Sequence, residues 1–262
     1  MSAGLEWSIL LPALLAGLIV LASHVPLGMR VLERGIIFID IAIAQFAGLG
    51  VILAHFLDWE GGWRTQVVAL GLAALGALLL HFTEKRWPQV QEAIIGTTFV
   101  LVASIAILML AHDAHGGEHL REMLVGQILW TSLDDLPMLA LVNGLVLLAW
   151  YGGVRKSPLG FYLLFAVAIT ASVQVVGVYL VFATLIVPAL AVHALRGGRA
   201  LLGGYLAGAA GYALGLVASA LWDLPSGAMI VCAIAASGLA VAALTRLPAV
   251  RGADARTAPA AP

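Results

Sequence analysis

The chain alternates long apolar runs with short breaks of charged, glycine or proline residues. Most runs are close to the ~20 residues that an α-helix needs to cross ~30 Å of hydrocarbon. We therefore predict an all-α fold, a polytopic transmembrane bundle of about nine helices within residues 1–248. The expected helices cover 7–29, 35–57, 65–82, 93–111, 136–151, 159–175, 178–195, 200–221 and 226–244.

The stretch 159–195 is the hardest to divide, because it contains no charged residue. It is too long for one crossing and barely long enough for two. We place a tight hairpin near Gln174 to Gly177, where a polar side chain and a glycine interrupt the run. The alternative is a broken or re-entrant helix, whose freed backbone groups must be buried in protein or line a water-filled cavity.

Composition supports a membrane protein and argues against other classes. Apolar residues make up 62% of the chain and charged residues 10%, whereas soluble domains average nearer half and a quarter. The net charge of -1 gives no case for a nucleic-acid partner, and a single cysteine, Cys232, cannot build a disulfide framework. Residues 249–262 are rich in Ala, Pro, Arg and Thr, so we expect a disordered cytoplasmic tail there.

Basic residues predict the orientation. Nine crossings put the two termini on opposite faces of the membrane. With the N-terminus outside, eleven of the thirteen Lys and Arg residues face the cytoplasm, and only Arg64 and Arg121 lie outside. Since cytoplasmic loops carry the excess of Lys and Arg, we predict an external N-terminus.

Four glycines recur at helical spacing in the run 200–221, at positions 204, 208, 211 and 215. Small residues let another helix approach closely in a membrane, where lipid gives no hydrophobic drive for association. We interpret this stripe as helix packing rather than as a functional site.

Asp40 is the only acidic residue well inside a predicted span. A buried carboxylate is costly in a membrane, so such residues usually face a bundle interior or an aqueous path. The functional hypothesis is therefore a place on an ion path. The structural alternative is a salt bridge to Arg30 or Arg34, or a hydrogen bond to a neighbouring helix.

Three more polar residues are candidates for the same path. Gln45 follows Asp40 on one helix, but five residues rotate it by ~140°, so the two cannot chelate together. His24 and His193 lie on other predicted spans and could meet Asp40 only if the fold brings them together. For either histidine alone, a hydrogen-bonded core or interfacial role is the simpler interpretation.

The predicted external loop after the fourth span is rich in metal-ligating side chains. It contains His112, Asp113, His115, Glu118 and His119. Imidazole and carboxylate groups suit zinc and, less well, manganese or iron. The alternative is a solvated loop without a metal. His115 to His119 also fits the H-x-x-E-H pattern of some zinc proteases, but Gly116 and Gly117 disfavour the helix that this chemistry requires.

The chain contains no phosphate-binding G-x-x-x-x-G-K-[ST] loop, no G-x-S-x-G elbow and no Cys-x-x-Cys pair. We therefore expect no enzyme activity, and any ATP must be hydrolysed by another chain.

Short motifs in a fixed order carry a family resemblance. They are Pro-Leu-Gly at 26–28, Val-Leu-Glu-Arg-Gly-Ile-Ile-Phe-Ile-Asp at 31–40, Gly-Leu-Gly-Val at 48–51, Ile-Gly at 95–96, Leu-Val-Gly-Gln-Ile-Leu at 124–129, Val-Gly-Val-Tyr-Leu-Val at 176–181, Leu-Ile-Val-Pro-Ala at 185–189 and Asp-Leu-Pro-Ser-Gly at 223–227. Together they resemble the zinc/manganese ABC-transporter permeases, the ABC-3 family. The resemblance implies eight or nine helices, pairing as a homodimer, a cytoplasmic ABC ATPase subunit and an extracytoplasmic metal-binding protein.

Two departures from the family pattern affect the expected site. The family usually has Gly-Asp with a histidine four residues later, whereas here Ile39 precedes Asp40 and Ala44 takes the histidine position. Only Asp40 carries over. The family's sizeable cytoplasmic segment between the fifth and sixth helices is reduced to residues 152–158.

The resemblance implies the permease subunit of an ATP-driven importer of divalent metal ions, in the inner membrane of a bacterium. Zn²⁺ is the first expected substrate and Mn²⁺ the second, with no permanently bound cofactor. Two alternatives remain from the residues themselves. One is a self-sufficient secondary carrier or channel with Asp40 as its cation site, and the other is a non-transporting membrane scaffold.

Overall fold

The computed structural model describes residues 6–57, 59, 62–110, 124 and 126–254, the last nine by their backbone only. Within these ranges the chain is helical and contains no strand. The α-helices are α1 (Trp7–Arg34), α2 (Ile39–Phe56), α3 (Gly62–Arg86), α4 (Gln91–Leu110), α6 (Leu136–Tyr151), α7 (Pro158–Val176), α8 (Val178–Ala191), α9 (Gly198–Trp222) and α10 (Ser226–Asp254). Three 3₁₀ turns, η1 (Pro88–Val90), η2 (Ile128–Trp130) and η3 (Val154–Lys156), lie in the connections. The expected all-helical membrane fold is confirmed.

Seven of the described helices are long and apolar enough to cross a membrane, and α6 and α8 are shorter apolar helices. The predicted span 178–195 was too long, because α8 ends at Ala191. The chain turns there: the backbone N–H of His193 donates to the carbonyl of Leu190, and Nδ1 of His193 lies 2.8 Å from the same oxygen. At the other end of the chain α10 reaches Asp254. The disorder expected for the tail stays a prediction, and residues 255–262 lie outside the described part.

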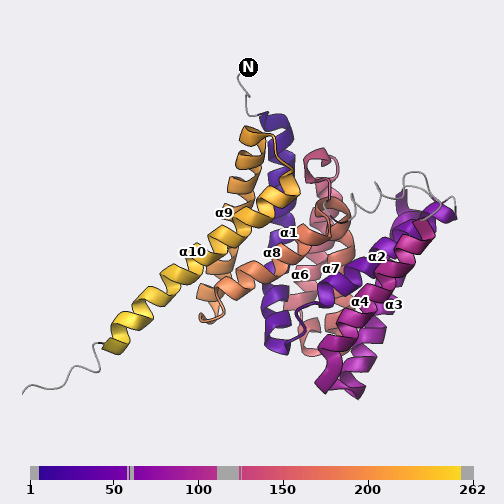
Figure 1. The fold of residues 1–262 in the computed structure, drawn as a ribbon, viewed down its shortest axis with the longest axis horizontal. Coiled ribbons are helices and arrows are strands. Elements are labelled where there is room, and N and C mark those ends of the chain that lie inside the picture. The colour runs from indigo at the N-terminus through magenta and orange to yellow at the C-terminus, as the bar shows by residue number, and fades with distance from the viewer. Residues whose placement is uncertain (1–5, 58, 60–61, 111–123, 125, 255–262) are drawn as a thin grey trace, which may run out of the picture.

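Helix α1 stands at the centre of the molecule, where it packs against α6, α8 and α9. On one flank α2 packs against α3 and α4, and on the opposite flank α9 packs against α10 (Figure 1). The N-terminal end of α1 and the C-terminal end of α10 lie at opposite ends of the bundle (Figure 1). This arrangement agrees with an odd number of crossings.

The glycine stripe of α9 forms two helix contacts, as its spacing predicts. A Cβ atom at Gly211 would lie 2.5 Å from Cα of Ile234 on α10, and Gly215 faces Ile230 in the same way. Gly208, one turn earlier, faces Leu21 of α1. The glycines therefore let the backbone of α9 approach the backbone of α10, and they make room for the side chain of Leu21 on α1.

Gly177 alone separates α7 from α8. Its φ of 80° and ψ of 163° are accessible to glycine at little cost, whereas most other residues would be strained there. The break is where the sequence predicts it, but α8 packs mainly on α1 and α10 and little on α7. The residues directly before α7 and those at the end of α8 lie at the same end of the bundle, so the chain reverses direction at Gly177. Because the two helices pack on different neighbours (Figure 1), the hairpin is open rather than tight.

All seven tryptophans of the chain lie at or beside helix ends. Trp7, Trp59, Trp63, Trp130 and Trp222 lie at the end of the bundle that holds the N-terminus of α1, and Trp87 and Trp150 at the other. Tryptophan concentrates at membrane interfaces. The two groups therefore mark the two surfaces of the membrane.

Candidate functional site

Asp40 occupies the first turn of α2 and is only 1% exposed. A short turn after Gly35 separates α1 from α2 and makes Asp40 the second residue of its helix. Free backbone N–H groups and the helix dipole favour negative charge at that position. Neither carboxylate oxygen has a hydrogen-bond partner among the described residues. Asp40 is therefore a buried carboxylate without a hydrogen-bond partner in the described part of the chain.

The salt bridges considered for Asp40 do not form, because both arginines have other partners. Nη1 of Arg30 lies 2.8 Å from Oε2 of Glu33. Nη1 of Arg34 lies 3.5 Å from Oε2 of Glu84 on α3, and its guanidinium lies 4.4 Å from the ring centre of Phe161. The interpretation of Asp40 as a salt-bridge partner of Arg30 or Arg34 is therefore not supported.

Gln45 is buried on the same helix, 2% exposed. Its position is ~140° around the helix from Asp40, so the pair does not share a face. Ala44, the position directly over Asp40, is also buried and supplies no ligand. Asp40 is thus the single metal-ligating side chain on its face of this turn.

His24 is fully buried in α1 and belongs to a polar network with α6. Its Nδ1 lies 2.8 Å from the carbonyl oxygen of Val20. Oγ of Ser23 lies 3.0 Å from the same Nδ1 and donates to Oδ1 of Asn143 over 2.5 Å. Nδ2 of Asn143 donates to the carbonyl of Leu139 over 3.0 Å.

The carbonyl contact determines the tautomer of His24. Because a carbonyl oxygen only accepts, the proton lies on Nδ1 and Nε2 carries a lone pair. Nε2 is buried and has no partner among the described residues. His24 therefore combines a network that fixes the ring with one free nitrogen, which is the form that binds a metal ion.

His193 is not in a span, contrary to the sequence-based expectation. It is exposed in the turn between α8 and α9, where it lines a cavity at the end of the bundle opposite to the N-terminus. The described residues contain no group of three His, Cys, Asp or Glu side chains placed to hold one metal ion. Asp40, His24 and His193 therefore do not form a common site within one chain. The loop candidates His112, Asp113, His115, Glu118 and His119 lie outside the described residues.

A second buried polar cluster joins α3, α4 and α7, and sequence analysis did not identify it. The rings of His81 and Tyr162 lie 5.3 Å apart, and Nε2 of Gln91 donates to the carbonyl of Leu80 over 2.9 Å. Nδ1 of His81, Oε1 of Gln91 and the hydroxyl of Tyr162 are buried and unpartnered among the residues placed. The signal was present, since His81 and Gln91 are polar residues at the ends of apolar runs.

Asn143 was also missed, although it is the only asparagine of the chain and lies inside an apolar run. An amide in such a run usually bonds across to a neighbouring helix, which is its role here.

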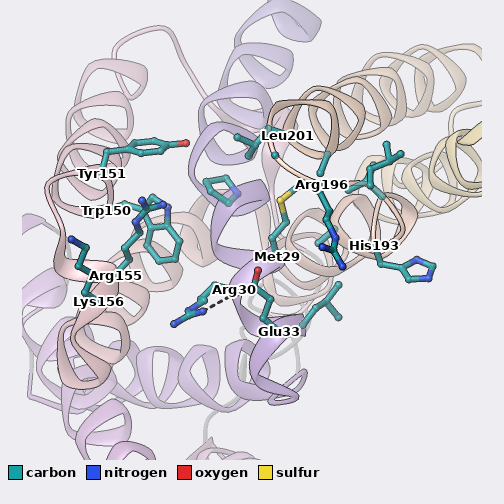
Figure 2. Close-up of a pocket in the computed structure, with 17 residues that line it drawn as sticks. Met29, Arg30, Glu33, Trp150, Tyr151, Arg155, Lys156, His193, Arg196 and Leu201 are labelled. Atoms are coloured by element: carbon teal, nitrogen blue, oxygen red, sulfur yellow. Dashed lines mark hydrogen bonds and ion pairs between the residues drawn. The ribbon is translucent and has the colours of Figure 1, made fainter.

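A cavity of about 880 Å³ opens where α1, α6, α8 and α9 meet at the end of the bundle opposite to the N-terminus. Its ionisable lining includes Arg30, Glu33, Arg155, Lys156, His193 and Arg196. Figure 2 shows Arg155 and Lys156 on one side, Arg196 and His193 on the other, and Arg30 with Glu33 between them. The cavity is basic and is separate from Asp40, which does not line it.

Comparison with known proteins identifies the fold. The chain is similar to the structure of PsaBC from Streptococcus pneumoniae in complex with Fab, with 21% identity, 89% coverage of both chains and a TM-score of 0.70. It is also similar to a structure described as a metal-chelate type ABC transporter in an inward-facing conformation, with 18% identity, 92% coverage of this chain, 85% of the other and a TM-score of 0.60.

No curated protein matches the chain. The family model of the ABC 3 transport family matches residues 6–157 and 152–246, which together cover most of the sequence. The chain belongs to the ABC 3 transport family.

Proposed function

We propose that this permease imports divalent transition metal ions, zinc first and manganese second, as the membrane subunit of an ATP-driven complex. Family membership supports an ABC transport permease and a multi-pass membrane protein. The ion, the bacterial inner membrane and the partners are part of the proposal. The partners are a cytoplasmic ABC ATPase, an extracytoplasmic metal-binding protein and a second copy of this chain.

The observation that carries the proposal is the unpaired, buried carboxylate of Asp40. The two candidate counterions, Arg30 and Arg34, are paired with Glu33 and Glu84. An intramembrane acid that no arginine neutralises is typical of an ion path. Zinc accepts carboxylate oxygen as a ligand, and manganese prefers it.

The described residues of one chain do not complete a metal site around Asp40. We propose that the missing ligands come from the second copy or from the loop that holds His112 to His119. In this mechanism the ion enters from the outer face, passes Asp40 in a cavity between the two copies, and leaves when the ATPase pair changes state. The outer loop would raise the local metal concentration or help the binding protein to dock.

Metal uptake into proteoliposomes tests the proposal. The permease and its ATPase are reconstituted with and without Asp40→Asn, and uptake of radioactive zinc and manganese is measured. Asp40→Asn keeps the size of the side chain but removes its charge, so we expect uptake to fall at least tenfold, as for loss of a metal-site group. The control is Asp134→Asn, which removes an exposed carboxylate at the outer end of α6 and should leave uptake unchanged.

Two outcomes would contradict the proposal. Uptake that persists without ATPase or ATP would favour the secondary carrier or channel. Equal uptake by the wild type and Asp40→Asn would remove Asp40 from the ion path.

A further inference from the structure

The cavity at the end of the bundle opposite to the N-terminus has an uncompensated positive charge. Arg30, Arg155, Lys156 and Arg196 line it, and Glu33 is the single acidic residue of the lining. Glu33 is already bound to Arg30 at 2.8 Å. Arg155, Lys156 and Arg196 form no ion pair with any residue that the structure places. Three cations therefore surround one space without counterions, which favours an anion there.

The remaining walls of the cavity are apolar. Met29 and Leu32 of α1, Val192 beside α8, and Leu201 of α9 line it together with the cationic side chains. Figure 2 shows the cationic groups on facing sides of this space. A small inorganic anion would use only the charges. An amphiphile with an anionic head would use both the charges and the apolar walls.

The cavity lies at the level of a membrane surface. Trp150 and Tyr151, the last residues of α6, line it, and Trp150 is one of the two tryptophans at this end of the bundle. Tyr151 is exposed, and the guanidinium of Arg155 lies 6.0 Å from the centre of its ring. Aromatic residues beside Arg and Lys at a helix end are typical of the headgroup region.

We propose that this cavity binds the headgroup of an anionic phospholipid from the adjoining leaflet. The phosphate lies between Arg155 and Lys156 on one side and Arg196 on the other, and the upper part of an acyl chain follows the apolar wall of α1 and α9. Basic pockets between membrane helices on the cytoplasmic side bind anionic headgroups in this way. The proposal does not depend on which ion the permease transports.

The lining of this cavity suits passage of a cation less well than binding of an anion. Three unpaired positive charges repel a divalent ion, and within the described chain no carboxylate but that of Glu33 faces the cavity. The lipid site and the Asp40 path are therefore different parts of the molecule.

Lipid binding to the purified full-length chain tests the proposal. Phosphatidylglycerol is titrated against the protein in detergent, with phosphatidylcholine in parallel, and bound lipid is counted by native mass spectrometry. The cavity variant is Arg155→Gln/Arg196→Gln. The matched control is Lys85→Gln/Arg86→Gln, which removes two exposed cations from the same end of the bundle but outside the cavity.

We expect the wild type and the control to bind phosphatidylglycerol more tightly than phosphatidylcholine. The cavity variant should lose roughly fivefold in phosphatidylglycerol affinity per cation, on the order of 25-fold for the pair. Phosphatidylcholine binding should be the same in all three proteins. If the double variant does not fold, Arg155→Gln and Lys156→Gln alone answer the question, each with a loss of roughly fivefold.

Several results would overturn the proposal. An equal loss in the cavity and control variants would mean non-specific attraction to a basic surface. Full displacement of the lipid by millimolar inorganic phosphate would mean a site for the free anion. Unchanged lipid binding with loss of ATPase association in the cavity variant would mean that the cavity is a protein contact.

Discussion

The guanidinium of Arg34, at the end of α1, lies 3.5 Å from the carboxylate of Glu84 on α3. The same guanidinium lies over the ring of Phe161 on α7. One side chain therefore contacts two other helices at the end of the bundle opposite to the N-terminus. Because this pairing occupies Arg34, that arginine forms no ion pair with Asp40.

Removal of this contact should weaken the packing of α1, α3 and α7 at this end of the bundle. We expect Arg34→Gln to lower the free energy of unfolding by about 1–2 kcal/mol, from the lost ion pair and the lost cation–π contact. Both side chains are partly exposed, which limits the effect. Denaturant unfolding in one detergent measures the change, and a double-mutant cycle with Glu84→Gln isolates the pair. A coupling energy of zero would show that the contact contributes nothing.

The Ser23–Asn143 hydrogen bond should stabilise the packing of α1 on α6. We expect Asn143→Leu to lower the free energy of unfolding by about 1–2 kcal/mol, because the hydroxyl of Ser23 loses its interhelical acceptor. Thermal unfolding of the purified protein measures the cost. Thr97→Val is the control, since Thr97 bonds only within its own helix, to the carbonyl of Ala93. Equal shifts for both variants would contradict an interhelical role for Asn143.

The close contact of α9 with α10 should not tolerate a larger side chain at Gly211. A Cβ there would lie 2.5 Å from the backbone of Ile234, so Gly211→Leu must push the helices apart. We expect Gly211→Leu to lower the free energy of unfolding by about 1–3 kcal/mol or to prevent folding. Gly71→Leu is the matched control, because no atom lies within 4 Å of a Cβ at Gly71. The comparison uses the yield of folded protein and its unfolding midpoint.

Asp135, outside the membrane spans, should give a small pH dependence of stability. The backbone N–H of Ser132 donates to its carboxylate over 2.9 Å, and the hydroxyl of Ser132 donates over 2.7 Å. These bonds, the backbone one first, lower the pKa of Asp135 below its usual value. Because the folded-state pKa is lowered, the stabilisation is present above about pH 4 and is lost as the pH falls through the folded-state pKa.

We expect the wild type to be more stable than Asp135→Asn at pH 7, by less than about 1 kcal/mol because the group is exposed. The difference should disappear in acid. A pH-independent difference, measured by thermal unfolding, would contradict this account.

The sequence predicted the positions of the helices well, because each helix depends on an apolar run and on the charged, Gly or Pro residues that directly flank it. Helix α6 begins and ends at the predicted residues, with Pro137 in its first turn and Gly152 directly after it. The break at Gly177 was also local, since a glycine follows a polar residue there. The direction in which α8 leaves that break was not, because it depends on packing against α1 and α10.

The candidate site was predictable only as a set of residue types. Asp40 could be identified because an acid in an apolar run is rare. Its surroundings could not be derived from the sequence. Arg34, a candidate partner of Asp40, pairs instead with Glu84, which lies 50 positions further along the chain. The network of His24 depends in the same way on the register between α1 and α6. The external-loop candidates stay predictions.

Because the tryptophans are divided unevenly between the two ends of the bundle, their intrinsic fluorescence can report the orientation of the protein in the membrane. Five indoles lie at one surface, including that of Trp130, which is 84% exposed, and two lie at the other. In sealed vesicles of uniform orientation, iodide added to the bathing solution quenches only the fluorophores on its own side. Strong quenching from outside right-side-out vesicles reports an external N-terminus, and weak quenching reports the reverse, without any label or mutation.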